Sequence, residues 1–242
     1  LQLDRGGLPE NDAGPAAVAA AGIEWLKRSQ DMSMSHDGGS ARDYSLIKGW
    51  SSSYPETSGY IVPTLIDYAD RTNDQALADR ARRMLDWLVS IQLPEGGFQG
   101  GKVDASPRVP VTFNTGQILM GLAAGVRRFG DAYRAPMKLA AAWLRDSLDA
   151  DGCWRKHATP FAAPGEKAYE THVSWGLFEA ARLEPDQGFG EVGLKQVRWA
   201  LTKQAGNGWF ASNCLELPGE PLTHTIGYVL RGVIEAYRFS GD

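Results

Sequence analysis

Two kinds of helical segment alternate along this chain. In the first kind, apolar residues occupy one face: Met84, Trp87, Leu88 and Ile91 recur at positions i, i+3, i+4 and i+7, with charged residues opposite. Similar segments surround three other tryptophans, and the four stand 62, 56 and 56 residues apart: Trp25, Trp87, Trp143 and Trp199. A period of this size is typical of repeat architectures, so the pattern predicts four amphipathic outer helices.

The second kind of segment is apolar almost all round, which is typical of a helix buried on most sides. Four such segments follow the outer ones: ETSGYIVPTLIDYA (56–69), FNTGQILMGLAAGV (113–126), ETHVSWGLFEAARL (170–183) and THTIGYVLRGVIEA (223–236). They predict four inner helices and hence four helix pairs. Pro63 interrupts the first, either by a kink or by a helix start near Val62.

The connections between segments are unequal in length. Inner segments lead into the next outer one through short links (71–74, 130–131 and 184–187), whereas outer segments lead into inner ones through about 20 residues. A glycine before an aromatic residue opens each long link and is expected to end the outer helix as a left-handed cap: Gly97-Phe98, Gly152-Cys153-Trp154, Gly208-Trp209 and, further along the link, Gly49-Trp50. All four long links should meet at one rim, together with the N-termini of the inner helices. Function is expected there.

Alternating helix pairs with glycine-aromatic turns resemble the α/α-toroid superfamily. YPETSGYIVPTL (54–65) and THTIGYVLRGVIEA (223–236) are similar to bacterial exopolysaccharide-locus proteins labelled squalene-cyclase-like or prenyltransferase-like. A more distant resemblance, through Tyr169–His172 and Thr223-His224, is to the C-terminal domain of glucuronyl C5-epimerases. We therefore expect an all-α, α/α-toroid domain over residues 16–242, after an N-terminal extension (1–15). Four pairs would form an open arc, a small ring or part of a larger assembly.

This resemblance implies a carbohydrate-active enzyme of bacterial polysaccharide metabolism, an epimerase, a lyase or a glycosidase. Two alternatives stay open: a non-catalytic carbohydrate-binding scaffold module, and an isoprenoid-binding toroid. The chain lacks the Asp-x-Asp-Asp acid motif of the terpene cyclases.

Polar residues at the starts of the inner segments are the catalytic candidates. Glu56 and Glu170 come from different pairs, and paired carboxylates supply the acid and base of glycosidic cleavage. A single base opposite a tyrosine or histidine would instead suit proton removal beside a uronate carboxylate. His172 and His224 are candidates for that role, because helix capping explains them poorly. For the carboxylates, the competing interpretation is a helix cap or a structural ion pair.

Seven further residues are predicted to bind substrate. Arg108 could grip a carboxylate through two hydrogen bonds, and Asn114 could orient a sugar. The remaining five are aromatic residues of the rim that could stack on a sugar ring or fill the space between helices: Trp50, Tyr54, Trp154, Tyr169 and Trp209.

The resemblance implies an oligo- or polysaccharide as the partner, and composition excludes two other classes. A net charge of −4 provides no basic field for nucleic acid, and no apolar run is long enough to span a bilayer. Two cysteines form no disulfide framework, and a cytoplasmic location is expected, although Leu1 at the first position is consistent with removal of an upstream segment. No cofactor or metal is predicted. The alternative is zinc held by Cys153, Cys214, His172 and His224, a ligand set that zinc accepts.

Overall fold

The alternation of outer and inner helices is confirmed in a computed structural model, which describes residues 7, 12–160, 162–217, 220 and 222–242. The outer helices are α2 (Gly14–Asp31), α4 (Gln75–Ile91), α6 (Arg134–Ser147) and α8 (Phe189–Leu201). The inner helices are α3 (Pro55–Thr72), α5 (Thr112–Phe129), α7 (Thr171–Ala181) and α9 (Thr223–Ser240). Most of the predicted N-terminal extension, residues 1–6 and 8–11, lies outside the described residues.

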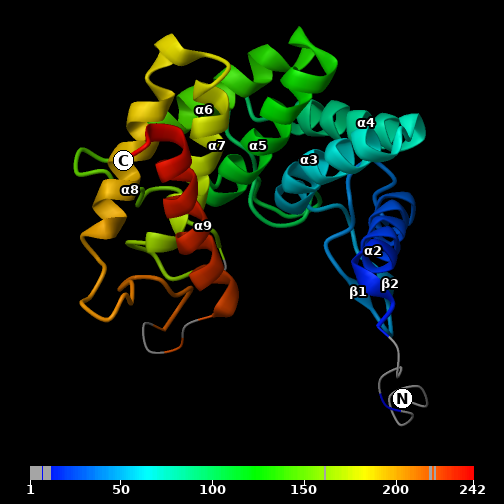
Figure 1. Cartoon of the computed structure of the whole chain (residues 1–242), viewed down its shortest axis with the longest axis horizontal. Helices are drawn as coiled ribbons and strands as arrows, with labels where there is room; N and C mark the ends of the chain where they lie inside the picture. Colours follow the sequence, from blue (N-terminus) through cyan, green and yellow to red (C-terminus); the bar gives the residue numbers. More distant parts are fainter. Residues whose placement is uncertain (1–6, 8–11, 161, 218–219, 221) are drawn as a thin grey trace.

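The helix pairs follow one another in an arc, from α2 and α3 to α8 and α9 (Figure 1). Within the arc, α3 packs on α5, α5 on α7 and α7 on α9. One apolar core runs through these contacts, including Leu65, Leu88, Leu119 and Leu177. This is the α/α-toroid arrangement predicted from the repeats. No helix in the described part of the chain is long and apolar enough to cross a membrane.

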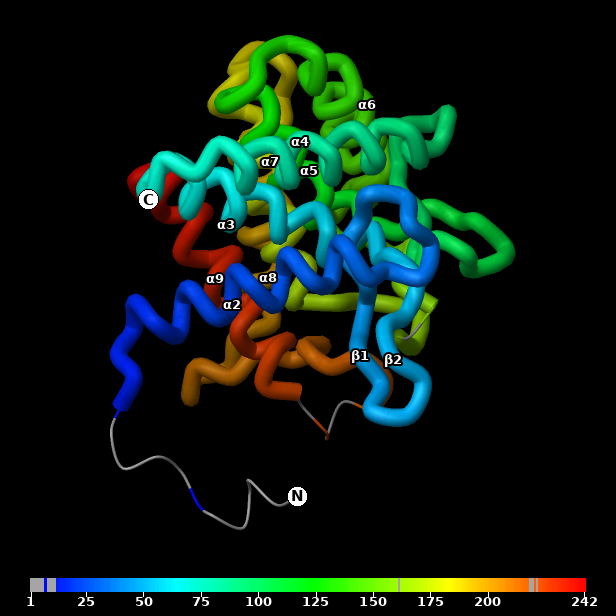
Figure 2. Tube along the Cα trace, turned by 90° about the vertical axis from the view of Figure 1, so that its right-hand side faces the viewer, coloured from blue at the N-terminus to red at the C-terminus, as the bar shows by residue number. Residues whose placement is uncertain are grey.

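Short elements occupy the connections. A small antiparallel hairpin, β1 (Tyr44–Ser45) and β2 (Gly49–Trp50), lies in the long link between α2 and α3 (Figure 2). Single turns of 3-10 helix, η1 (Asp131–Tyr133) and η3 (Pro185–Gln187), form short links between pairs, and η2 (Ala168–Glu170) leads into α7. The long connections therefore lead into the N-terminal ends of the inner helices, where the sequence predicts the site.

Glycines set the close spacing of the inner helices. A Cβ added at Gly59 would stand 2.5 Å from the Cα of Ile118, and one at Gly176 would stand 2.5 Å from the carbonyl oxygen of Gly116. At Gly232, an added Cβ would overlap the backbone carbonyl of Thr171. These positions join α3 to α5, α5 to α7 and α7 to α9. The inner layer thus depends on backbone contact that any larger residue would separate.

Each repeating tryptophan after the first packs against a glycine in the preceding long connection. A Cβ added at these glycines would stand 2.5 Å, 3.0 Å and 3.2 Å from the facing tryptophan, in the pairs Gly39–Trp87, Gly97–Trp143 and Gly152–Trp199. Each of these tryptophans thus packs one helix pair against the long connection of the preceding helix pair. In the first connection the equivalent glycine is Gly39, which corrects the prediction that Gly49-Trp50 fills this place.

Two local predictions are wrong. The predicted glycines do not cap the outer helices, because the residues that follow α4, α6 and α8 are Gln92, Leu148 and Thr202. After α4 the left-handed residue is Gly96 and not Gly97: Gly96 lies in a tight turn with a φ of 102°, and its N–H donates to Leu93 O. A left-handed glycine serves this turn because other residues pay a steric cost there. Pro63 does not start a helix either, since α3 runs through it from Pro55.

Candidate active site

Four of the predicted site residues meet at one cavity on the rim. This cavity has a volume of about 210 Å³ and lies where α3 and α9 begin, beside α5 and η2. The predicted members are Tyr54, Glu56, Tyr169 and His224, and the other lining residues are Arg42, Phe113, Thr159, Leu215, Thr225 and Tyr228. The long connections and the inner-helix starts therefore converge as the repeat pattern predicts.

Glu56 is the carboxyl group of this cavity. The Tyr54 hydroxyl donates a hydrogen bond of 3.0 Å to Glu56 Oε2. Burial raises the pKa of Glu56 to about 7, and the hydrogen bond from Tyr54 and the charge of Arg42 oppose that rise. Near neutral pH the carboxyl group is therefore present in both its protonated and its ionised form, which suits proton transfer.

Tyr54 and Arg42 complete the surroundings of the carboxyl group. Burial and the charge of Glu56 raise the pKa of Tyr54, so its hydroxyl stays protonated and remains a donor. The Arg42 guanidinium lies 5.6 Å from the centre of the Tyr54 ring. Because its charge lowers the pKa of both groups, Arg42 is a cation within reach of the cavity.

Sequence reasoning missed Arg42 and Tyr228. Arg42 lies in an irregular connection without any motif. Tyr228, in contrast, had a signal: Gly227-Tyr228 near the start of α9 repeats Gly59-Tyr60 near the start of α3. The same register makes His224 the counterpart of Glu56.

Glu170, the other predicted catalytic carboxylate, lies beneath the surface instead of facing Glu56 across the cavity. Its side chain is 4% exposed, and Oε2 has no hydrogen-bond partner among the described residues. Burial raises its pKa well above the usual value, against the opposing charge of Lys167. Lys167 Nζ instead donates to the carbonyl oxygens of Cys214 and Leu215. Burial therefore favours the protonated, neutral form of Glu170.

Replacing Glu170 by glutamine is expected to stabilise the protein at neutral pH. A raised carboxyl pKa costs stability as pH rises above the unfolded value near 4.5, because the unfolded chain then releases a proton that the folded chain keeps. The free energy of unfolding of the wild type should fall, relative to that of Glu170→Gln, by up to about 1.4 kcal/mol for each pH unit above the unfolded-state pKa. Urea unfolding at pH 4.5 and pH 7.5 measures the difference. Equal differences at the two pH values would contradict a buried neutral acid.

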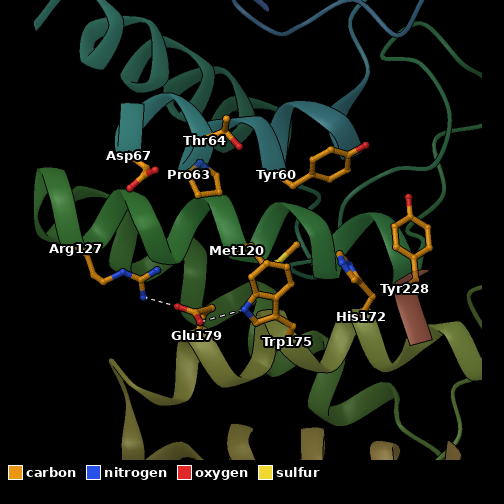
Figure 3. A pocket seen from close by; sticks show the side chains of 10 residues that line it. All are labelled: Tyr60, Pro63, Thr64, Asp67, Met120, Arg127, His172, Trp175, Glu179 and Tyr228. Atoms are coloured by element: carbon orange, nitrogen blue, oxygen red, sulfur yellow. Dashed lines mark hydrogen bonds and ion pairs between the residues drawn. The ribbon is translucent and has the colours of Figure 1, made fainter. Parts of the chain in front are cut away.

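His172 lies at a second cavity, of about 560 Å³, on the face of the inner helices (Figure 3). Its Nδ1 is 2.9 Å from Gln117 Oε1. Burial and the charge of Arg231 lower its pKa to about 4, so the ring is neutral at neutral pH. Tyr228 lines both cavities and so separates His172 from the Glu56 site.

The other predicted substrate-binding residues do not line the Glu56 cavity. Asn114 is fully buried and neither amide atom has a hydrogen-bond partner of good geometry, although the amide is near enough to the Tyr54 hydroxyl to lower its pKa. Arg108 is exposed and its Nε donates to Gln99 Oε1 at 2.8 Å. The hydrogen bond of Arg108 therefore lies within the long connection after α4 and not at the cavity.

The three tryptophans predicted to bind substrate pack elsewhere. The Trp154 ring is buried, and its indole N–H donates to Leu144 O at 2.9 Å, so it fills the space between helices and offers no face for stacking. The Trp50 ring lies 4.7 Å from that of Trp25 and braces the β1–β2 hairpin. Trp209 is partly exposed in the last long connection, outside both cavities.

The residues of the zinc alternative are dispersed. Cys153 packs in a small cluster with Trp199 and Ala200, and burial raises the pKa of its thiol to about 12, which disfavours the thiolate that zinc requires. Among the described residues, no group of three or more His, Cys, Asp and Glu side chains is arranged to hold a metal ion.

Comparison with known proteins gives matches in structure alone, because no family model and no curated protein matches the sequence. An unsaturated glucuronyl hydrolase specific for heparin superposes with a TM-score of 0.69 at 16% identity, over 93% of this chain and 62% of its own. A possible GH105 member from Salmonella enterica serovar Paratyphi A gives 0.66 at 15% identity, over 91% and 65%. A protein described as a polysaccharide lyase gives 0.62 at 15% identity, over 78% and 62%.

These comparisons establish the fold. The chain spans less than two thirds of the length of each of these three structures. They do not test the squalene-cyclase-like and epimerase labels, which stay predictions. At these identities the likeness shows that this chain shares the helical-toroid fold of the three proteins.

Proposed function

We propose that the protein is a carbohydrate-active enzyme that acts on unsaturated uronides, with Glu56 as the proton donor. The observation that carries the proposal is a single carboxyl group, with a pKa raised to about 7, at a rim cavity beside a fixed hydroxyl and a cation. The structural similarity to an unsaturated glucuronyl hydrolase supports an unsaturated uronide as substrate, and the similarity to a polysaccharide lyase supports a polysaccharide-derived one.

The number of carboxyl groups favours this reaction over ordinary glycosidic displacement. Displacement at a saturated sugar uses two carboxylates, one as the acid and the other as the base or nucleophile. Among the described residues that line the cavity, Glu56 is the only acidic side chain, and Glu170 lies outside the lining. One acid/base group is sufficient for protonation of a carbon–carbon double bond and for addition of water.

The chemistry balances with Glu56 alone. An unsaturated uronide contains an enol ether, in which the ring oxygen is bonded to one carbon of the double bond. Glu56 gives its proton to the other carbon, and the positive charge is shared with the ring oxygen. Water adds to the charged carbon and returns a proton to the Glu56 carboxylate. The hemiketal that forms opens to a ketone and leaves a hemiacetal at the anomeric carbon. This hemiacetal breaks down to an aldehyde and releases the next sugar as an alcohol.

Three other residues of the cavity would assist this reaction. Arg42, at the cavity wall, would bind the uronate carboxylate, a pairing in which arginine can use two parallel hydrogen bonds. Tyr54 would hold the Glu56 carboxyl group toward the sugar through the hydrogen bond already present. His224 lines the cavity and would contact the hydroxyl groups of the substrate.

Loss of the absorbance of the unsaturated uronate tests the proposal. Unsaturated oligosaccharides from several uronate polysaccharides are incubated with the protein across a range of pH. We expect the absorbance to fall, and the rate to decrease as pH rises through about 7, because only protonated Glu56 can donate.

Three other results of this assay would contradict the proposed hydration of unsaturated uronides, and each would indicate a different function. Intact polysaccharide that gains this absorbance, at a rate that increases with pH, would indicate a lyase with Glu56 as the base. New reducing ends from saturated sugars would indicate a glycosidase. Binding without any reaction would indicate the scaffold module.

A further inference from the structure

The second cavity adjoins the Glu56 site, with Tyr228 at the boundary between them. Tyr228 lines both, and the Tyr60 ring lies in the second cavity near the first. Burial raises the pKa of Tyr60, and the charges of Tyr228, Glu56 and Tyr54 add to that rise, so the three groups lie within electrostatic reach of Tyr60. From this junction the cavity extends along α3, α5 and α7 to Arg127, near the C-terminal end of α5 (Figure 3).

The two cavities differ in the size of ligand that each can hold. Pockets for small ligands usually measure about 300–1,000 Å³. The Glu56 cavity, at about 210 Å³, falls below that range and has room for little more than one sugar ring. The second cavity, at about 560 Å³, lies within the range. A longer oligosaccharide held at Glu56 therefore has space to continue in one direction, past Tyr228.

The lining of the second cavity combines an aromatic surface with oriented polar groups. The Trp175 indole N–H donates to Glu179 Oε1 at 3.2 Å, and Glu179 Oε2 pairs with Arg127 at 2.8 Å. The Arg231 guanidinium lies 4.2 Å from the centre of the Trp175 ring. Aromatic faces beside charged groups with fixed orientation suit sugars, which present apolar C–H faces and hydroxyl edges. A prenyl chain would remove water from these charged groups without offering them a hydrogen bond in return.

His172 adds an acceptor to this lining. Because Gln117 Oε1 accepts from Nδ1, the neutral ring carries its proton there, which leaves Nε2 free of a proton. The ring is 4.7 Å from Tyr228 and 5.3 Å from Trp175. His172 would therefore accept a hydrogen bond from a sugar hydroxyl group and would not take part in proton transfer at Glu56.

We infer that the second cavity is a binding subsite for the sugars that follow the one held beside Glu56, so that the protein selects oligosaccharides longer than a disaccharide. This inference rests on the proposed function. Trp175 and Tyr60 would contact sugar faces, while His172 and Glu179 would bind hydroxyl groups.

Direct binding tests the subsite separately from the chemistry. The Glu56→Gln protein is titrated calorimetrically with an unsaturated uronate disaccharide and with the tetrasaccharide of the same polymer. We expect the tetrasaccharide to bind about tenfold more tightly, which corresponds to about 1.4 kcal/mol. Adding Trp175→Ala should remove this advantage, and it should weaken the disaccharide less than the tetrasaccharide, because only one sugar of the disaccharide lies beyond the Glu56 cavity. Adding Thr64→Phe, which fills the cavity from α3, should do the same.

A matched control is Tyr237→Ala, which removes an exposed aromatic side chain of α9 outside both cavities and should preserve the advantage. Equal affinities for the two sugars, or an advantage that survives both Trp175→Ala and Thr64→Phe, would overturn the subsite. Normal turnover by Glu56→Gln would instead overturn the role of Glu56 and leave the binding result intact. Circular dichroism of each variant verifies that it is folded.

Discussion

Replacing Glu56 by glutamine is expected to lower kcat by about 10²–10⁴, the usual contribution of a positioned acid or base. Glutamine keeps the shape of the side chain and can accept the Tyr54 hydrogen bond, but it has no acidic proton to give. KM should change little, because Arg42 and the aromatic wall remain. Initial rates and a thermal unfolding curve are measured on the same preparation. A stable variant with wild-type kcat would remove Glu56 from the mechanism.

A companion variant tests the same role through the pH profile. The Tyr54 hydrogen bond lowers the pKa of Glu56, so Tyr54→Phe should raise it further above its ordinary value. For a proton donor, the fall in rate at high pH then moves to higher pH, while the phenyl ring keeps the wall in place. If the rate of Tyr54→Phe instead falls at a lower pH, or is only smaller at every pH, then the Tyr54 hydrogen bond does not favour the ionised form of Glu56.

The second large effect is on stability. Alanine substitutions at two glycines of α9, Gly232 and Gly227, should change the free energy of unfolding in opposite directions. Gly232→Ala would place a methyl group against the backbone of Thr171 in α7, where neither side is flexible. We expect a loss of about 1–3 kcal/mol in the free energy of unfolding, or more if α9 is displaced. Gly227, on the exposed side of the same helix, has no atom within 4 Å of an added Cβ.

Gly227→Ala should therefore stabilise the protein by up to about 1 kcal/mol, the difference in helix propensity between the two residues. Urea unfolding of both variants compares the same chemical change at two points of α9. Equal effects would show that α9 does not pack against α7 as closely as the structure has it. Because Gly227 is near Tyr228, binding of a disaccharide is measured in parallel.

Much of the fold could be predicted from the sequence because helix periodicity directly records burial. The outer segments carry a charged face and the inner ones do not, which separated the two layers. Turn geometry was predicted less well: Gly97 was expected to cap α4, whereas the left-handed residue is Gly96, in a turn after the helix has ended, and only backbone dihedrals distinguish the two cases. The close packing of Gly59 and Gly232 likewise depends on which helix faces each glycine.

The candidate site was predicted in part, for a related physical reason. The repeat register brought Glu56 and His224 to the same rim, but it could not distinguish a residue at the cavity wall from one a few ångströms below it. Glu170 also starts an inner helix, yet it is buried. Arg42 was missed because irregular connections follow no period. Tertiary packing, and not local pattern, decides which polar side chains reach the cavity.

The Glu56 cavity takes its walls from both ends of the arc, from α3 at the first pair and α9 at the last. Between these two helices the connection runs through α5 and α7, with α3 packed on α5, α5 on α7 and α7 on α9. In repeat proteins each unit is positioned by its neighbours, so a displacement at any of these contacts would change the placement of Glu56 relative to His224. Catalytic competence would then report the integrity of the described array, and a substitution between α5 and α7 could abolish turnover without touching the cavity.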